Sequence, residues 1–278
     1  MPDAGQSVRV ASWNIHRCLG GDRRRDASRV ARIILALDAD VVALQEVETP
    51  TQSATESSAF DLLYELASAG YEVLQGPTMV AHNHHYGNVL LSRLPVRECV
   101  PVRLAHPGRE PRGLIDARLD LGRRPQHSKG LVSGLRCMAT HLGLGWAERR
   151  AQIADIATRV SHSTQVSDCP EPMVLLGDFN EWSRHSRRLS PINRLLQQAP
   201  IFATFPARWP LLALDRIWYR GCQLQHCESV HAQLTRIASD HLPLLADIRI
   251  DRPCIAPSCS RQALPTQQSP QLSSHTSP

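Results

Sequence analysis

Two features that would place a chain in a membrane or outside the cytoplasm are missing from this sequence. The first residues, MPDAGQSVRVASWNIH, contain no apolar segment of the kind found in secretory signal peptides. No apolar run approaches the ~20 residues that span a bilayer. We therefore expect a soluble, cytoplasmic protein without a transmembrane segment, and we expect it to act as a monomer.

Paired cysteines are also absent. The eight cysteines are scattered, and none forms a CxxC pair. A zinc knuckle needs tighter pairing, and thiols in the cytoplasm are reduced, so we expect free thiols, many of them small core residues. The stretch HNHHYG (His82–Gly87) resembles a metal cluster, but a zinc site needs a defined geometry and a further ligand. We interpret it as a polar loop beside a cleft.

The composition is that of one soluble globular domain with a tail. The chain has 278 residues, 42% hydrophobic and 21% charged, and no internal repeat. Its formal charge of +5 suits a polyanionic partner such as nucleic acid or an anionic lipid surface. Residues 251–278 are rich in Pro, Ser and Gln and cannot bury enough apolar surface to order their backbone. We expect a catalytic domain over residues 1–250 and a disordered tail over 251–278.

The first 45 residues predict a strand, a helix and a second strand. Val8–Asn14 alternates between apolar and polar residues, and Asp40–Glu46 is a short apolar run typical of a buried strand. Between them, Asp26 is the expected N-cap of a helix that buries its apolar face and turns Arg29 and Arg32 to solvent. The two strands should be neighbours, with the helix packed over them.

Strands dominate the rest of the chain. Helices are expected over 60–69 and from Trp146 to Val160, and a further helix should start at Ser190-Pro191 with Ser190 as its N-cap. The expected strands are Asn88–Ser92, Gly113–Leu121, Leu135–Leu142, Met173–Asn180, Arg216–Tyr219, Leu224–Val230 and Leu244–Ile250. One continuous pattern of this kind predicts two packed sheets with helices outside.

Polar residues that can bind a metal or move a proton stand at the ends of the predicted strands. They are Asn14, Glu46, Asn88, His141, Asp178, Asn180, Asp215, Asp240 and His241. Taken singly, each has an ordinary alternative, since Asn14 can close a turn and His141 can be a structural histidine. Seven strand ends supplying such residues is the layout of a site on a rigid sheet scaffold. We therefore interpret GDFN, at the end of MVLLGDFN, as part of a site.

The chemistry of the set favours a hard divalent cation. Oxygen ligands from Glu46, Asp178 and Asp240 suit Mg²⁺, or Mn²⁺ as a substitute, better than zinc. Asp215 beside His241 would give an oriented imidazole. A metal, a carboxylate and a His–Asp pair fit the attack of water on phosphorus.

Eight blocks of this chain stand in an order that resembles a known superfamily. They are SWNIH, ALQEV, YGNVLLSRLPV, PRGLIDARL, ATHLG, LLGDFNE, LDRIW and SDHLPLLADI. Their order resembles the endonuclease/exonuclease/phosphatase superfamily, which includes pancreatic-type deoxyribonucleases, abasic-site endonucleases, neutral sphingomyelinases and inositol polyphosphate 5-phosphatases. The resemblance covers about residues 8–250 and is greatest to small bacterial members of unsettled substrate. It implies a four-layer α/β/β/α sandwich of two packed, mostly antiparallel sheets, with the site at one edge of both.

The resemblance also implies roles for individual residues. Glu46 and Asn14 match metal-binding positions, and Asp240 matches a second metal-site position. Asp178 matches the residue that positions or deprotonates the nucleophilic water, or protonates the leaving group. The other matches are Asn180 and His141 facing the phosphate, His241 hydrogen-bonding it, Asp215 holding His241, and Asn88 and Arg112 as substrate-binding residues bordering the site.

Departures from the superfamily concern the substrate-specific parts. Deoxyribonucleases of this type place a carboxylate beside their counterpart of His141, whereas this chain has EPRGLI in that region. The tyrosine of abasic-site enzymes and the basic motifs of inositol phosphatases have no matching block. The catalytic set is kept, and the parts that would identify the substrate are not recognisable.

We expect an Mg²⁺-dependent phosphoesterase that hydrolyses a phosphodiester, with nucleic acid as substrate because of the positive charge. A phospholipid phosphodiesterase of the sphingomyelinase kind or a phosphomonoesterase is an alternative, and a non-catalytic binding module on the same fold is another. RWPLL (Arg208–Leu212) offers a tryptophan and an arginine to stack on a base or contact lipid, and a packed loop is an equal alternative.

Overall fold

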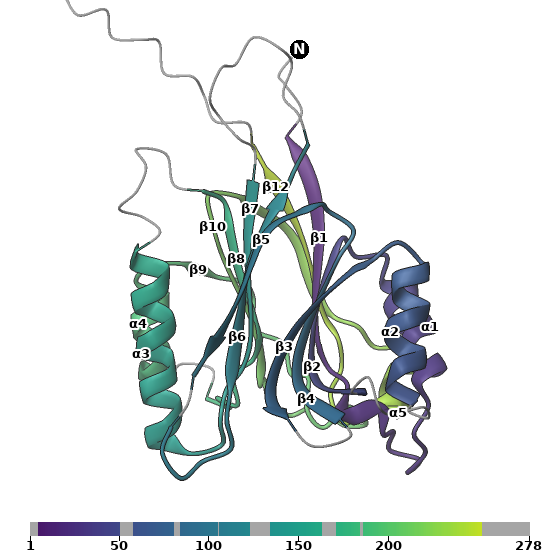
Figure 1. Ribbon diagram of the computed structural model, residues 1–278. Helices are drawn as coiled ribbons and strands as arrows, with labels where there is room; N and C mark the ends of the chain where they lie inside the picture. The colour runs from purple at the N-terminus through teal and green to yellow at the C-terminus, as the bar shows by residue number, and fades with distance from the viewer. Residues whose placement is uncertain are drawn as a thin grey trace, which may run out of the picture.

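Two six-stranded sheets pack face to face, with helices on both outer faces (Figure 1). The computed structural model describes residues 5–50, 58–80, 84–104, 106–122, 134–162, 171–183 and 186–251. The tail predicted for residues 251–278 lies outside this part of the chain, apart from its first residue. The four-layer α/β/β/α sandwich expected from the sequence is confirmed.

The bounds of the elements follow the predicted pattern at most positions. The strands are β1 (Gln6–Asn14), β2 (Val41–Pro50), β3 (Glu72–Val80), β4 (His84–Ser92), β5 (Val96–Arg103), β6 (Gly113–Asp120), β7 (Gly134–His141), β8 (Met173–Asp178), β9 (Gln197–Gln198), β10 (Asp215–Arg220), β11 (Gln223–Ser229) and β12 (Leu244–Ile250). The helices are α1 (Ala27–Leu37), α2 (Ser58–Ser68), α3 (Trp146–His162), α4 (Ser190–Asn193) and α5 (Thr235–Ala238), with 3-10 turns η1 (His16–Cys18) and η2 (Arg187–Leu189).

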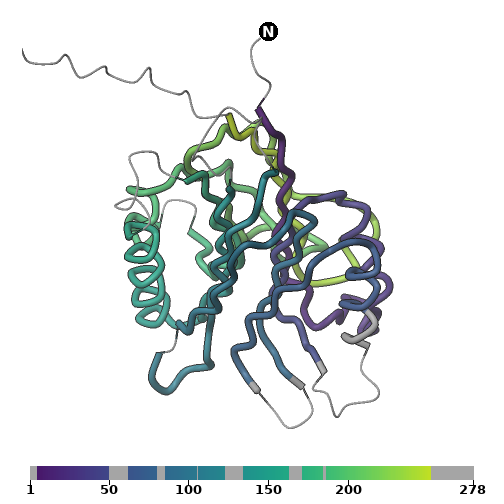
Figure 2. The backbone as a smooth tube through the Cα atoms, turned by 45° about the horizontal axis from the view of Figure 1, so that its top comes forward, coloured from purple at the N-terminus to yellow at the C-terminus, as the bar shows by residue number. Residues whose placement is uncertain are grey.

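Each sheet contains one parallel pair among antiparallel neighbours. The first sheet has the order β11-β12-β1-β2-β4-β3 and the second has the order β5-β6-β7-β8-β10-β9. β1 and β2 are parallel and are joined through α1, and β7 and β8 are parallel and are joined through α3. A parallel pair needs such a crossover, and the helix of the crossover covers the outer face of its sheet. Figure 2 shows α1 and α2 on one side of the two sheets and α3 on the other.

Apolar side chains fill three layers. Val10, Ala43, Ile115 and Leu176 belong to the layer between the sheets. Ile34, Leu44 and Leu66 belong to the layer under α1 and α2, and Met138, Ile156 and Trp218 to the layer under α3 and α4. Because both faces of the central strands are buried, those strands appear in the sequence as continuous apolar runs.

The first helix confirms its predicted cap and corrects one of its predicted faces. The Asp26 side chain accepts a hydrogen bond from the backbone nitrogen of Arg29 at 2.8 Å, so Asp26 is the N-cap. Arg29 was expected in solvent but is buried. The loop before the helix folds over it, and the Arg29 guanidinium pairs with Asp22 at 2.7 Å, which compensates its charge.

The predicted cap at Ser190 is wrong by one position. Ser190 is already helical, and α4 is a single turn whose N-cap is Leu189. The 3-10 turn η2 runs directly into α4, and Ser186 caps that turn by accepting from the backbone nitrogen of Arg188. The chain therefore enters its helical geometry earlier than Ser190-Pro191 indicates.

Three strands, β3, β5 and β9, had not been predicted, and all of them lie at sheet edges. β9 has two residues, too few to show a pattern in the sequence. β3 contains Gly76 and Pro77, which lower strand propensity and are tolerated at an edge. β5 (VRECVPVR) is largely exposed, and its apolar and charged residues do not alternate. The predicted polar loop at His82–Gly87 is partly wrong, because the backbone from His84 onward belongs to β4, while His82 lies outside the described residues.

Two further expectations concern thiols and the membrane. Cys18, Cys99, Cys137, Cys222 and Cys227 are free thiols, as expected, and the other three cysteines fall outside the described part of the chain. Within the described ranges, every helix is too short or too polar to cross a bilayer.

Candidate active site

Three neighbouring strands of the second sheet end level with one another. The register pairs His141 at the end of β7 with Asp178 at the end of β8, and Asp178 with Asp215 at the start of β10. Side chains at paired positions project to the same face of a sheet, so these three lie in one line across its edge. This edge is at the lower end of the molecule in Figure 1, away from the labelled N-terminus.

The glycine before Asp178 is required by the close approach of β7. Gly177 has φ of +148°, and a Cβ at this position would fall on the carbonyl oxygen of Thr140. Only glycine combines this backbone angle with such a close neighbour. The Gly of GDFN therefore sets the position of the following carboxylate.

Asp178 lies at the centre of the cluster and is buried. Its Oδ2 is 3.1 Å from Asn14 Nδ2, 3.5 Å from His141 Nε2 and 3.8 Å from His241 Nε2. Its Oδ1 accepts a hydrogen bond from the backbone nitrogen of Asn180 at 2.9 Å. The carboxylate is therefore oriented from both sides.

His241 is held by Asp215 and, through it, by Thr204. His241 Nδ1 lies 2.9 Å from Asp215 Oδ2, and the same oxygen accepts a hydrogen bond from Thr204 Oγ1 at 2.6 Å. Burial by itself would lower the pKa of His241, but the charges of Asp215 and Asp178 outweigh it and raise this pKa to about 10. His241 is therefore an imidazolium at neutral pH, with its Nε2–H on the side of Asp178.

His141 has an arginine for its partner. Arg112 Nη1 lies 3.3 Å from His141 Nδ1, and the same guanidinium pairs with Glu110 at 3.3 Å. Burial lowers the pKa of His141 to about 4, and the nearby Arg112 adds to this effect against the opposing charge of Asp178. Since arginine can only donate, Nδ1 of the neutral ring accepts, and its proton is on Nε2.

A carboxylate pair and an amide mark the place where a cation fits. Asn14 Nδ2 lies 3.2 Å from Glu46 Oε1 as well as near Asp178. Glu46 lies within β2 at a register shift and has φ of +57°, so the regular alternation of side chains along the strand is interrupted there. The carboxylate oxygens of Glu46 and Asp178, on either side of Asn14, are the hard ligands that a divalent cation such as Mg²⁺ prefers.

A second group of side chains also offers ligand atoms. Asp178, Asp215 and His241 each present one atom, all within 4.8 Å of one another. A cation there would displace the imidazolium of His241 from its ion pair with Asp215. Glu46 and Asn14 require no such loss, which favours them as the residues that would hold the ion.

Asp240 lies at the margin of the cluster. Its Oδ1 is 3.7 Å from His16 Nδ1, and its side chain is 41% exposed. The preceding Ser239 donates a hydrogen bond to the backbone oxygen of Asn14 at 2.7 Å, which ties this loop to the end of β1. The predicted metal role of Asp240 stays a prediction.

The two remaining asparagines differ in position. Asn180 follows Asp178 and donates from Nδ2 to the backbone oxygen of Leu142 at 2.8 Å. Asn88 is buried on β4, and its Nδ2 donates to the backbone oxygen of Gly113 at 2.9 Å, across the seam between the sheets. Asn180 therefore joins the cluster, whereas the amide nitrogen of Asn88 is used to connect the sheets.

Two contacts at the candidate site were not predicted from the sequence. Thr204 had drawn no attention, because a single threonine in an irregular loop follows no pattern. The ion-paired guanidinium of Arg112 against His141 was also missed, although Arg112 itself was expected near the site. Both contacts depend on how loops return to the strand ends.

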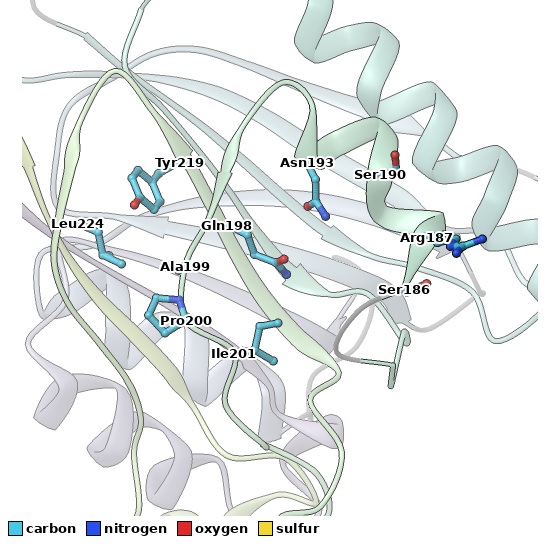
Figure 3. A pocket seen from close by; sticks show the side chains of 10 residues that line it. All are labelled: Ser186, Arg187, Ser190, Asn193, Gln198, Ala199, Pro200, Ile201, Tyr219 and Leu224. Carbon is cyan, nitrogen blue, oxygen red and sulfur yellow. The ribbon is translucent and has the colours of Figure 1, made fainter.

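A separate groove lies at the open edge of the sandwich beside β9 (Figure 3). Its labelled side chains include Tyr219 of β10, Leu224 of β11, Gln198 of β9 and Arg187 of η2. None of the predicted site residues lines it. The chemistry of the chain is therefore concentrated at the strand ends and not in this groove.

Comparison with known proteins agrees with this architecture. The chain is 29% identical over 266 residues to "Uncharacterized protein YbhP" of Escherichia coli, covering 90% of this chain and 100% of that protein. A family protein from Bacteroides vulgatus matches in structure with a TM-score of 0.67 at 20% identity, over 88% of this chain and 99% of that one. The human nocturnin catalytic domain matches with a TM-score of 0.63 at 22% identity, over 87% of this chain and 94% of that one. ANGEL2, a 2',3'-cyclic phosphatase, matches with a TM-score of 0.66 at 18% identity, over 89% of this chain and 97% of that one.

At these identities the solved structures show a shared fold. The model of the Endonuclease/Exonuclease/phosphatase family matches residues 11–241, which span the chain from β1 to His241. The chain belongs to the endonuclease/exonuclease/phosphatase family.

Proposed function

We propose that this chain is a divalent-metal-dependent phosphodiesterase, with Mg²⁺ as its cation and Mn²⁺ as a substitute. The observation that carries the proposal is the position of Asp178 between two histidines that are held by opposite kinds of partner. Nδ1 of His241 lies 2.9 Å from the Asp215 carboxylate, and Nδ1 of His141 lies 3.3 Å from the Arg112 guanidinium. Membership of the family supports hydrolysis of a phosphoester.

Each residue of the cluster has a separate role in the proposed hydrolysis. Asp178 Oδ2 accepts a proton from the attacking water, whose oxygen forms the new bond to phosphorus while the ester P–O bond breaks. The Nε2–H groups of His241 and His141 donate to the phosphoryl oxygens, on which negative charge builds. The leaving oxygen takes its proton from solvent. A cation held by Glu46 and Asn14 would supply Lewis-acid stabilisation of the same charge.

Two classes of substrate are candidates. Nucleic acid, expected from the net charge of +5, stays a prediction. The 2',3'-cyclic phosphatase activity named for ANGEL2 supports phosphoester hydrolysis in general. A phospholipid is the second candidate, because large apolar side chains such as Trp209 and Leu211 are exposed on loops beside the site. The roles of Asn180, Asp240, Asn88 and Arg112 toward substrate or metal also stay predictions.

The test uses a soluble substrate that favours neither macromolecule. Hydrolysis of bis(p-nitrophenyl) phosphate and of p-nitrophenyl phosphate is measured with Mg²⁺, with Mn²⁺ and with EDTA. Turnover should require the metal and favour the diester. Asp178→Asn should lower kcat by about 10³-fold. Asp155→Asn, at an exposed aspartate of α3, is the matched control and should behave as the wild type.

Other results of this test would contradict the proposal or indicate a different function. Turnover in EDTA, or wild-type turnover in Asp178→Asn, contradicts the proposal. Preference for the monoester would make the chain a phosphomonoesterase. Metal binding without turnover of either substrate would make it a non-catalytic binding module.

A further inference from the structure

Five large apolar side chains stand exposed close to the strand ends that carry the candidate site. Within the described part of the chain, six large apolar side chains are more than half exposed, and five of them lie within six residues of His141, Asp178 or Asp215. The five are Leu144 (74%), Trp146 (53%), Trp182 (62%), Trp209 (70%) and Leu211 (79%), together named the apolar rim. The sixth is Tyr64 on α2 (67%). Exposed apolar groups concentrated in one place mark an interaction surface.

The apolar rim is placed by the strand ends that carry the catalytic groups. Leu144 and Trp146 lie three and five positions beyond His141, and Trp182 lies four positions beyond Asp178. Trp209 and Leu211 lie six and four positions before Asp215. These three ends are level in the register of β7, β8 and β10. The loops therefore leave from one line, and the rim shares its end of the sheet with the site.

Hydrogen bonds hold the rim loops in place. Asn180 Nδ2 ties the loop after β8 to the backbone oxygen of Leu142 in the loop after β7, at 2.8 Å. The backbone nitrogen of Ala207 donates to the backbone oxygen of Asp240 at 2.7 Å, and this ties the loop before β10 to the segment carrying His241. The rim residues are thus presented by loops fixed to the site.

Arginines are interleaved with the rim. The guanidinium groups of Arg150 and Arg188 lie 6.0 and 5.6 Å from the ring centre of Trp146. Arg208 precedes Trp209 and is exposed, and neither Arg150 nor Arg208 forms an ion pair with a described residue. Of the 31 basic residues in the chain, Lys129 is the single lysine. Guanidinium groups bind phosphate in a bidentate manner, so the rim suits a surface of anionic phosphates.

The most exposed members of the rim distinguish two such surfaces. Leu144 and Leu211 exceed every rim tryptophan in exposure. Single-stranded nucleic acid gains from aromatic rings that stack on bases, and an aliphatic side chain offers it little. A bilayer takes both, because tryptophan favours the headgroup level and leucine the hydrocarbon boundary.

We propose that the apolar rim docks this protein on an anionic phospholipid bilayer, with the candidate site facing the headgroups. The catalytic consequence rests on the proposed function, since the phosphoesters of the headgroups would then lie before Asp178. The docking itself needs no catalysis. It follows from exposed apolar area together with nearby positive charge.

The test measures binding to vesicles in EDTA, where the proposed reaction is stopped. Wild-type protein should sediment with vesicles of equal parts phosphatidylglycerol and phosphatidylcholine, and far less with phosphatidylcholine alone. The emission of the rim tryptophans should shift to the blue on binding. The double variant Leu144→Ala/Leu211→Ala should bind about tenfold more weakly or worse. Tyr64→Ala, which removes an equally exposed side chain from α2, should bind as the wild type.

Further measurements separate docking from unfolding, from catalysis and from nucleic-acid binding. A thermal melt of each variant excludes unfolding as the cause of lost binding. Asp178→Asn should bind vesicles as the wild type, so that a failure of the proposed function and a failure of docking are distinguishable. The proposal is overturned if the wild type stays in the supernatant, if the double variant binds vesicles normally, or if it instead loses affinity for single-stranded oligothymidine.

Discussion

Arg112 and His141 form an arginine–imidazole pair, in which Nη1 of the guanidinium lies 3.3 Å from Nδ1 of the ring. A carboxylate in this place would favour the imidazolium, whereas arginine favours the neutral ring. The pairing also fixes the tautomer, because Nδ1 can only accept. His141 is thus arranged to donate a hydrogen bond from Nε2.

If His141 acts through this donor alone, glutamine can replace it. We expect His141→Gln to keep kcat within about tenfold of the wild type, and His141→Ala to lower it by about 10²-fold. Steady-state hydrolysis of bis(p-nitrophenyl) phosphate checks this. Equal losses in the two variants would mean that the ring transfers a proton. Arg112→Met should allow the other tautomer, which ¹⁵N NMR of the His141 ring would detect.

Thr204 should act as a positioning residue for His241. Thr204→Val keeps the shape but removes the hydroxyl that donates to Asp215 at 2.6 Å. We expect a loss of ~1–3 kcal/mol in the free energy of unfolding, because a buried carboxylate oxygen loses a donor. We also expect a lower kcat with KM unchanged, because Asp215 holds the imidazole less firmly. Thr158→Val on α3, at an exposed threonine, should change neither quantity. An unchanged kcat in Thr204→Val would limit Thr204 to a structural role.

The two histidines should give the metal-free protein opposite pH dependences of stability. The pKa of His241 is about 10 in the folded protein and near 6.5 in the unfolded chain. Its stabilisation should be complete below pH 6.5 and decline as the pH rises toward 10. The pKa of His141 is about 4 when folded, so stability should decline as the pH falls from 6.5 toward 4.

Urea unfolding at a series of pH values, with EDTA present, checks both slopes. His241→Gln should remove the alkaline decline, and His141→Gln should remove the acidic one. An alkaline decline that persists in His241→Gln would show that other groups cause it.

Glu181 should be a strong stability determinant behind the GDFN turn. Its carboxylate is fully buried, and Oε2 lies 2.9 Å from Arg188 Nη1 and 3.9 Å from Arg149 Nε. Glu181→Gln should cost ~3–5 kcal/mol in the free energy of unfolding, because it leaves the buried guanidinium of Arg149 without its carboxylate. The control Glu98→Gln breaks an exposed pair with Arg118 and should cost less than ~1 kcal/mol. Equal costs in urea denaturation would contradict this prediction.

The features that could be predicted from the sequence are those that depend on neighbouring residues. A buried strand that ends in a polar residue can be recognised from neighbouring letters, so Asp178 and His141 could be identified. Asp26 could be identified as a cap for the same reason. Contacts between loops depend on strand register, and this is why Thr204 and the partner of His141 could not be found.

Edge strands were the weakest part of the prediction. β3 and β5 are each buried less than the central strands, and their sequences carry little alternation. Arg29 was misplaced for a related reason, since its burial depends on a loop that folds back over the helix. For β3 and β5 a neighbouring strand is absent on one side, and for Arg29 the deciding contact is with Asp22 in the loop before the helix.

Because the site depends on the level register of β7, β8 and β10, turnover should depend on native strand pairing. A slip of β8 by one residue would turn Asp178 to the opposite face of the sheet and separate it from both histidines. No partly paired form would therefore retain a fraction of the activity. Specific activity should measure the share of molecules with native strand pairing, independently of their helix content or compactness.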